Sequence, residues 1–288
     1  MTAGGTGAAD ENPGHDEVER LRAEVRDLRA RVRTRPLIAR AQGILQERYE
    51  LSDGDSAFAL MQQASQRFNV KLRMLADAVI TVPRPDHGER LWFPRRVRHP
   101  EPPLSFVPGH GREPRNRGAV LSAVLSQTLA VVGTGMGNVQ LADRVRGGLT
   151  LEKHTGLTED FVDFFEHVSG EGTACAQAAR DVAQVTVRDV ETDPVFTEPA
   201  RAAILEAGSR ACHSVPLTTA SGLCVGMVSA HAEHTLRGLT RAQLKVLDVV
   251  GAEAGRWLAW HDRTVVLNAL EYLHALGSAR RGTRMRRA

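Results

Sequence analysis

The sequence predicts a multidomain α+β protein, in which a coiled coil and a three-helix bundle precede a domain with a largely antiparallel central sheet. Three observations support this fold class. Apolar residues over the first 80 or so positions recur at helical spacing. Residues 83–117 contain eight prolines, a density that no helix or buried strand tolerates. Beyond Gly118, short β-rich runs alternate with helical stretches, as is typical of an α+β domain.

Residues 16–33 predict a parallel, two-stranded coiled coil. Apolar residues alternate at spacings of three and four, with Val at each a position and Leu at each d position, which favours two parallel strands. Glu17 and Glu24 occupy g positions, where each would face Arg22 or Arg29 of a partner chain. The alternative is one amphipathic helix that packs on its own domain, because the pattern covers little more than two heptads. The predicted dimerisation residues are Val18, Leu21, Val25, Leu28 and Val32.

Three short helices after this heptad pattern predict a minimal bundle. Pro36 is expected to interrupt the heptad pattern and to occupy the first turn of a new helix, where proline is well tolerated. The second helix is expected to begin at a capping box that opens with Ser52. It should end at Asn69, a residue that suits left-handed backbone. The third helix should stop before Pro83.

Charge divides the chain in the same way as composition does. Residues 118–262 carry 11 basic and 17 acidic side chains, whereas residues 263–288 carry six basic and one acidic. Basic flanks beside an acidic domain indicate a polyanionic partner, although basic linkers and tails are often simply solvated. The predicted segments are a disordered N-terminus at 1–15, the coiled coil and bundle at 16–82, a Pro/Arg-rich linker at 83–117, an α+β domain at 118–262, and a helix extension with a basic tail at 263–288.

Several classes of protein do not fit this composition. No stretch approaches the ~20 apolar residues that span a membrane, and the N-terminal residues lack the order of a signal peptide. We therefore expect a cytoplasmic protein. Cys175, Cys212 and Cys224 are too few for a disulfide framework. With the nearby histidines they match no paired-ligand spacing, so no metal site is expected.

Residues 35–80 resemble an ANTAR domain, a coiled coil followed by a three-helix bundle that binds RNA. The resemblance implies transcription antitermination, in which dimers bind paired hexanucleotide-loop hairpins in nascent transcripts and prevent a terminator from forming. Recognition in loops makes physical sense, because the major groove of an RNA duplex is too deep and narrow for side chains. The resemblance is carried by Arg35, Pro36, Ile38, Ala41, Gln42, Gly43, Ile44, Leu45, Ala57, Phe58, Ser65, Asn69, Lys71, Leu72, Leu75 and Ala76.

The candidate RNA-binding residues lie in this stretch. Arg40 and Gln42 are expected off the buried stripe of their helix. Gly43 costs a helix about 1 kcal/mol relative to Ala, which a close approach of RNA to the backbone would explain. Gln42 stands where the family most often has lysine, and for each basic residue singly a solvated surface charge is the alternative. The predicted set is Arg40, Gln42, Gly43, Arg67, Lys71 and Arg73.

Residues 118–262 resemble a GAF domain of the kind common in actinobacterial regulators. Such domains bind varied small molecules, and some serve only as dimer interfaces. No residue selects a ligand or a cofactor; if the domain has a sensor pocket, it should lie between the sheet and the loop at 172–196. Proteins with both modules usually place the ANTAR domain last, whereas here it comes first. The matching residues are 137–141, 161–165, 172–175, 187–190, 193–196, 207–208, 210–211, 214–217 and 226–227.

These features together predict a homodimeric RNA-binding antitermination regulator. Its GAF-like domain would sense an unidentified small molecule or support dimerisation. The alternative is a protein–protein signalling adaptor, whose helical module contacts a partner protein and binds no RNA. Catalysis is not expected, because the sequence offers no convergent acid, base and nucleophile, and no catalytic residue is assigned.

Overall fold

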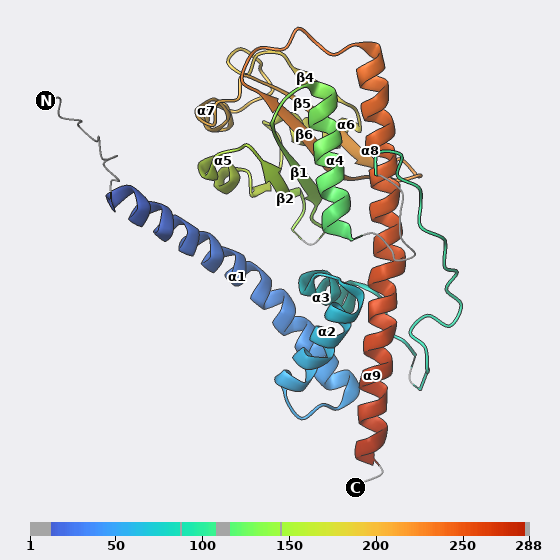
Figure 1. Ribbon diagram of the computed structural model, residues 1–288. Coiled ribbons are helices and arrows are strands. Elements are labelled where there is room, and N and C mark those ends of the chain that lie inside the picture. Colours follow the sequence, from blue (N-terminus) through green and yellow to red (C-terminus); the bar gives the residue numbers. More distant parts are fainter. Residues whose placement is uncertain (1–12, 87, 108–115, 145, 286–288) are drawn as a thin grey trace, which may run out of the picture. The chain divides into compact units, whose positions relative to one another are not determined.

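The chain forms two compact units (Figure 1). In the computed structural model, the first unit comprises Met1–Phe93 with Ala269–Ala288, and the second comprises Pro94–Asn268. The C-terminal residues therefore belong to the same unit as the N-terminal helices. Over the described ranges, no helix is long and apolar enough to span a bilayer. The structure describes residues 13–86, 88–107, 116–144 and 146–285; side chains before residue 35 are described for Glu17, Arg20, Leu21, Glu24 and Leu28, and those after Arg280 are not described.

Helix α1 (Pro13–Tyr49) contains both the predicted coiled-coil segment and the first helix of the bundle. The expected interruption at Pro36 is wrong, because the helix continues through this exposed proline. Proline lacks an N–H, so the hydrogen bond to the carbonyl four residues earlier is missing. Helical backbone nevertheless persists on both sides of that position. Residues 13–15, which the sequence assigned to a disordered N-terminus, are helical, since α1 begins at Pro13; residues 1–12 lie outside the described residues.

Part of the predicted dimerisation surface can be located on α1. Leu21 and Leu28 are 48% and 51% exposed, so both apolar side chains are half open to solvent. The side chains of Val18, Val25 and Val32 lie outside the described residues. Along the same stretch, Arg20 pairs within the helix with Glu17 at 2.6 Å. At these two leucines, other described residues of the chain do not cover the apolar positions of the heptad pattern.

Helices α2 (Gly54–Phe68) and α3 (Leu72–Thr81) complete the three-helix bundle. The N-cap of α2 is Asp53 and not Ser52: the Asp53 carboxylate accepts the Ser56 N–H at 2.7 Å, and the Ser52 hydroxyl donates to that carboxylate. A carboxylate is as good a cap as a hydroxyl. The predicted stop at Asn69 is confirmed, with φ 50° and ψ 43°. Helix α3 ends before Pro83, as expected.

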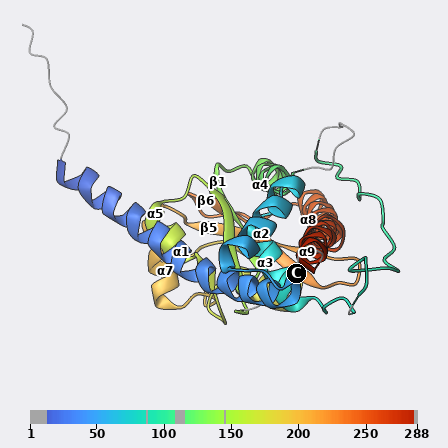
Figure 2. The ribbon, with the colours of Figure 1, turned by 90° about the horizontal axis from the view of Figure 1, so that it is seen from below.

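Helix α9 (Leu267–Met285) packs beside this bundle in the first unit (Figures 1 and 2). The sequence predicted a helix extension with a basic tail over residues 263–288, and helical backbone continues to Met285. Apolar burial explains why the helix is held, since it fills the core of the unit. The buried apolar residues of this unit include Ala41, Leu45, Tyr49, Ala57, Leu60, Met61, Ala64, Val70, Leu75, Ala76, Ala78, Val79, Trp92, Ala269, Leu270 and Leu273.

A six-stranded sheet forms the centre of the second unit. Its strand order is β3-β2-β1-β6-β5-β4, and every neighbouring pair is antiparallel, as the sequence predicted. Strand β3 has only two residues, which are too few to show a strand period in the sequence. The strands are β1 (Met136–Ala142), β2 (Leu149–Thr155), β3 (His167–Val168), β4 (Val185–Val187), β5 (Ala211–Thr218) and β6 (Cys224–Ala232).

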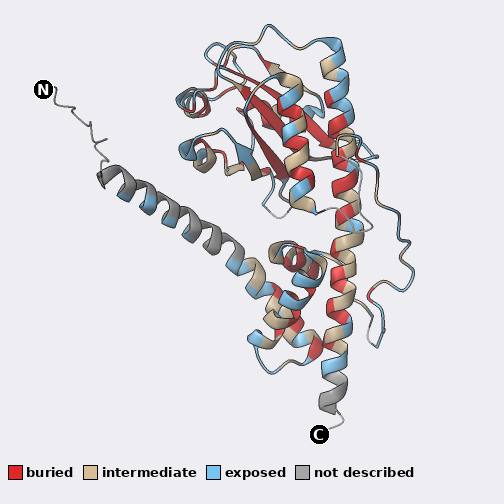
Figure 3. Ribbon diagram, in the orientation of Figure 1, coloured by how far each residue is buried: buried red, intermediate tan, exposed pale blue. Residues whose placement is uncertain are grey.

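Helices α4 (Arg117–Val132) and α8 (Arg241–His261) cover one face of this sheet (Figure 3). Alternate residues of each strand point to this face, where Val139, Val215 and Val228 join the apolar core. Helix α8 lies directly against β5, because a Cβ added to Gly255 would be 2.3 Å from the backbone of Thr218. The sheet is therefore sealed tightly on this side.

Three short helices cover the opposite face of the sheet. They are α5 (Glu159–Phe164), α6 (Ala174–Asp181) and α7 (Glu198–Glu206), and α6 was not predicted. Thr158 and Thr173 cap α5 and α6 with side-chain oxygens, which explains where these short helices begin. A second apolar core joins these helices to the sheet through Cys212 and Met227.

The Pro-rich segment has no helix or strand among its described residues, as its composition predicts. Two apolar side chains of this segment are nevertheless buried. Trp92 is 4% exposed and donates from Nε1 to the Pro83 carbonyl in the first unit, at 2.8 Å. Leu104 is also 4% exposed and belongs to the core under α4 in the second unit. Leu91, beside Trp92, remains 55% exposed.

Candidate functional site

The outer face of α1 presents two of the predicted RNA-binding residues to solvent. Arg40 and Gly43 are both exposed, on the side of the helix away from the buried Ala41 and Leu45. A Cβ added to Gly43 would meet no described atom within 4 Å. Packing within the described chain therefore does not require a glycine at this position, and the backbone there is open to an external partner.

Gln42 has a different environment from Arg40 and Gly43. Its side chain is half-buried, and Nε2 donates to the Gly54 carbonyl at 3.0 Å. This bond joins α1 to the first residue of α2. The structure thus gives Gln42 a role in holding the bundle together. A lysine at this position would donate to the same carbonyl from a charged group.

The three remaining residues of the predicted set flank one turn. Arg67 is exposed in the last turn of α2, and Lys71 is the exposed N-cap residue of α3. Arg73 is half-buried in the first turn of α3. Asn69 reverses the chain between them with left-handed backbone. The structure therefore brings Arg67, Lys71 and Arg73 to a single α2–α3 turn, and places Arg40, Gln42 and Gly43 on α1.

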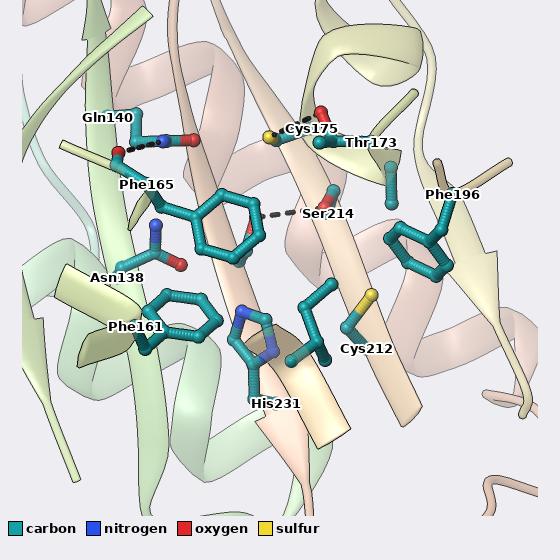
Figure 4. A pocket seen from close by; sticks show the side chains of 13 residues that line it. Asn138, Gln140, Phe161, Phe165, Thr173, Cys175, Phe196, Cys212, Ser214 and His231 are labelled. Carbon is teal, nitrogen blue, oxygen red and sulfur yellow. Dashed lines mark hydrogen bonds between the residues drawn. The ribbon is translucent and has the colours of Figure 1, made fainter. Parts of the chain in front are cut away.

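The second unit contains a cavity of about 20 Å³ between the sheet and its cover of short helices (Figure 4). This is room for about one water molecule. The cavity lies between the sheet and residues of the 172–196 segment, which is where the sequence placed any sensor pocket. The strand side consists of Asn138, Gln140, Cys212, Ser214, Ser229 and His231; the cover side consists of Phe161, Phe165, Thr173, Ala174, Cys175, Phe196 and Ile204.

Several of the polar groups around this cavity are paired. The hydroxyls of Ser214 and Ser229 lie 2.8 Å apart, and Ser209 Oγ lies 3.0 Å from Nδ1 of His231. Gln140 Nε2 donates to the Phe165 carbonyl at 3.2 Å. In contrast, Asn138 Oδ1 and Gln140 Oε1 are buried and have no hydrogen-bond partner among the described residues.

Burial controls the ionisation of the titratable groups that line the cavity. It lowers the pKa of His231 to about 4, so the ring is neutral near pH 7. Burial raises the pKa of the Cys175 and Cys212 thiols, and Cys175 Sγ lies 3.2 Å from the Thr173 hydroxyl. A thiol reacts as its thiolate. The cavity therefore favours neutral groups and holds both cysteines in their unreactive form.

The loop side of this cavity lies in the segment that the sequence indicated, whereas the residues of its strand side were not singled out. A signal was present in β1, where Asn138 and Gln140 are two residues apart in a strand that is otherwise apolar and is buried up to Leu141. Side chains at i and i+2 share one face of a sheet. Two amides on a buried face indicate a polar site within the domain, because buried polar groups need partners.

The fold and these two sites define a modular protein, with a small helical module and an α+β module that encloses a cavity. Residues 26–80 match the family model described as ANTAR domain. This part of the chain is therefore an ANTAR domain. A comparison with curated proteins found no match.

Solved structures similar to the chain include GAF domains. The GAF domain/HD domain protein from Geobacter sulfurreducens has 15% identity and a TM-score of 0.42, covering 51% of this chain and 94% of that one. The cyanobacteriochrome TePixJ GAF domain has 15% identity and a TM-score of 0.42, covering 53% and 95%. Free methionine-R-sulfoxide reductase from Neisseria meningitidis, in complex with its substrate, has 19% identity and a TM-score of 0.37, covering 53% and 96%.

Proposed function

We propose that this chain is a dimeric, RNA-binding transcription antitermination regulator whose GAF-like domain senses a signal or supports dimerisation. The observation that carries the proposal is the ANTAR domain at residues 26–80. The protein acts by binding and not by catalysis. Its targets are hairpin loops in nascent transcripts, which assigns the activity to the cytoplasm.

The surface of the helical bundle supports binding to a nucleic acid. Arg40, Arg67 and Lys71 are exposed, and cations of this kind bind phosphates and supply most of the sequence-independent affinity. Gly43 leaves the backbone of α1 open beside Arg40. Bases in a loop are unstacked and accessible, so side chains on the surface of a small bundle are able to contact their edges.

Dimerisation through α1 supports the recognition of two loops by one protein. Leu21 and Leu28 are apolar, half exposed and seven residues apart, which puts them at equivalent positions of successive heptads. Association of two such helices would remove both side chains from water. A parallel dimer would carry two bundles, one for each hairpin loop.

The signal reaches the RNA-binding module through the C-terminal helices in this proposal. Helix α8 covers the sheet of the second unit, and the chain continues through a π-helical turn, η1 (Asp262–Val266), into α9. Helix α9 packs in the first unit, where His274 bonds to Tyr49 at the end of α1. A ligand shifts such a protein only by the difference between its affinities for two states. The π-helical turn is a suitable place for those states to differ, since such turns occur often at functional sites.

The proposal is tested by titrating the full chain with RNA that carries two hexaloop hairpins, at near-physiological salt. The control RNA has the same stems and substituted loop bases. We expect selective binding of the first RNA, with an affinity that falls steeply as salt rises, because phosphate contacts release counterions. Equal binding of both RNAs would overturn recognition of the loop bases. No binding of either RNA would overturn RNA binding and favour a protein–protein adaptor.

A further inference from the structure

Two buried acceptors on β1 have no protein donor within the described chain. Gln140 is 1% exposed, and its orientation is fixed because Nε2 must donate to the Phe165 carbonyl, which can only accept. Its Oε1 is thereby left unpaired. Asn138, two residues earlier and 3% exposed, has an unpaired Oδ1. Figure 4 shows both amide groups at the cavity wall. Buried amide oxygens are nearly always bonded, so these two acceptors indicate a missing donor.

The lining of the cavity excludes a charged occupant. Of the 13 described residues that line it, none is Asp, Glu, Lys or Arg. His231 has its Nδ1 engaged by Ser209 at 3.0 Å, and its ring lies edge-on to Phe161 with centroids 5.1 Å apart. A formal charge transferred into this site would lose its hydration without gaining an ion pair. The occupant is therefore uncharged.

Aromatic side chains on the cover side favour a flat occupant. Phe161, Phe165 and Phe196 line the cavity, and the centroids of the first two rings are 4.4 Å apart. Such rings pack well against planar conjugated groups, by stacking or edge to face. The apolar rings and the amide oxygens lie on opposite walls, so an occupant with a flat body and a polar edge satisfies both.

In this conformation the cavity is too small for an organic ligand. About 20 Å³ admits one water molecule and no larger organic molecule. The strand wall is held by the ladders of β1, β6 and β5, whereas the cover consists of helices of nine residues or fewer and the turns between them. Entry of a ligand must therefore displace the cover and not the sheet.

We propose that this cavity binds a small, uncharged, planar molecule that presents N–H donors, of the chemical class of aromatic primary amides, to Asn138 Oδ1 and Gln140 Oε1. This rests on the sensory role proposed above and names the class of its signal. Donation to the two oxygens satisfies acceptors that have no donor among the described residues. The same molecule would displace the short helices α5, α6 and α7 that cover the cavity. The domain with the ligand would therefore differ in structure from the domain without it.

Benzamide is the probe for the test, with two matched molecules as controls. Benzoate has the same outline but carries a charge and no donor; methyl benzoate is uncharged and has no donor. Binding to the full chain is measured by ligand-detected NMR. We expect benzamide to bind at least about tenfold more tightly than either control, since unpaired buried groups discriminate strongly. Equal binding of benzoate or methyl benzoate, or no benzamide binding at millimolar concentration, would overturn the proposal.

Substitutions on β1 locate the site. Asn138→Leu removes one unpaired acceptor and should reduce the preference for benzamide over methyl benzoate to less than about threefold, because one of two donor contacts is lost. Gln140→Met tests the second acceptor if the first variant does not fold. The control is Thr128→Val, a buried polar-to-apolar change in α4 on the opposite face of the sheet. An unchanged preference in both β1 variants would contradict the assignment.

This experiment is independent of the RNA titration. It involves no RNA and follows the ligand signal alone, so a failure to bind benzamide selectively leaves the antitermination proposal standing. Conversely, a chain that binds benzamide but no RNA would support the proposed ligand site and contradict the proposed antitermination function.

Discussion

Tyr49 Oη lies 2.8 Å from Nδ1 of His274, a residue 225 positions further along the chain. The other ring nitrogen, Nε2, lies 3.0 Å from the Glu89 carbonyl, which can only accept a hydrogen bond. In the neutral ring Nε2 therefore carries the proton, and Nδ1 accepts from the Tyr49 hydroxyl. Burial raises the pKa of Tyr49 to about 12, so this donor remains protonated at physiological pH. The pair holds α9 to the end of α1.

Tyr49→Phe should loosen α9 in the first unit. The variant keeps the ring but leaves Nδ1 of buried His274 without a donor, which costs about 1–3 kcal/mol. We expect hydrogen exchange of α9 amides to accelerate by roughly tenfold or more, since about 1.4 kcal/mol corresponds to a factor of ten. Tyr272→Phe is the control, because that hydroxyl has no hydrogen bond among the described residues, although its ring packs edge-on to Phe68. Equal exchange in the two variants would show that the hydroxyl of Tyr49 does not hold the helix.

Gly277→Ala should also release α9, against the direction that helix propensity predicts. Alanine stabilises a helix interior by about 0.5–1 kcal/mol relative to glycine. Here, however, the added Cβ would lie 2.6 Å from ring carbons of Tyr49. Because the Tyr49 ring is buried, we expect the clash to dominate and the protection of α9 amides to fall. Increased protection would mean that the ring moves aside and that close packing at Gly277 is unimportant.

The features that sequence analysis predicted correctly depend on neighbouring residues. Asn69 ends α2 because it tolerates left-handed backbone, and the antiparallel strands follow from runs of β-forming residues separated by turns. The bond between Tyr49 and His274 could not be predicted in this way. Nothing near His274 in the sequence distinguishes a helix that docks on α1 from one that extends into solvent. The burial of Trp92 has the same origin, since its partners include His274, with ring centroids 5.7 Å apart.

In the candidate sites, too, features that depend on neighbouring residues could be predicted from the sequence, and contacts between distant residues could not. The loop at 172–196 could be assigned to the pocket because its residues match a family pattern. The acceptors on β1 were visible in the sequence as Asn138 and Gln140, but whether a buried amide is paired depends on the fold. Likewise, Gln42 and Arg40 differ by two positions on α1, and only the position of Gly54 in space explains why the first bonds within the bundle.

Acidification should destabilise the second unit through two buried histidines. Burial lowers the pKa of His213 to about 4, against an opposing effect of Asp248, and lowers that of His231 to about 4. The unfolded chain has ordinary histidines with pKa about 6.5, so below that pH it binds more protons than the folded chain. Stability should therefore be independent of these rings above pH 6.5 and fall between pH 6.5 and 4. Each pKa unit corresponds to about 1.4 kcal/mol, which limits the loss to roughly 3 kcal/mol per ring.

Histidine variants isolate this effect from the titration of carboxylates. His231→Gln and His213→Gln remove the titrating ring and keep polar atoms for their partners, Ser209 for the first and Thr186 with Gln184 for the second. Thermal unfolding between pH 7 and pH 4.5 should show a shallower decline in each variant than in the unmodified chain. Declines of equal slope would show that both rings are protonated in the folded protein.

Removal of basic side chains from the helical module should weaken RNA binding without unfolding it. Arg40→Ala with Lys71→Ala removes two exposed cations from α1 and α3. We expect the affinity for the two-hairpin RNA to fall and the salt dependence to decrease by about one unit for each lost phosphate contact. Arg241→Ala with Lys245→Ala is a control of equal charge on exposed positions of α8. If both double variants lose the same affinity, the effect arises from net charge and the assignment of Arg40 and Lys71 is wrong.

Charge introduced into the heptad pattern should dissociate the proposed dimer. Leu21→Asp with Leu28→Asp places carboxylates at two successive d positions, where a partner helix would bring like charges together and bury them. Sedimentation of the full chain should then change from dimer to monomer at micromolar concentration. Leu91→Asp with Leu223→Asp is the matched control, because both leucines are more than half exposed and lie outside α1. A dimer that persists in the first variant would place the association elsewhere, whereas a monomeric unmodified chain would exclude the two-bundle mechanism for this protein. Selective binding to two-hairpin RNA should be lost together with the dimer, because one bundle contacts one loop.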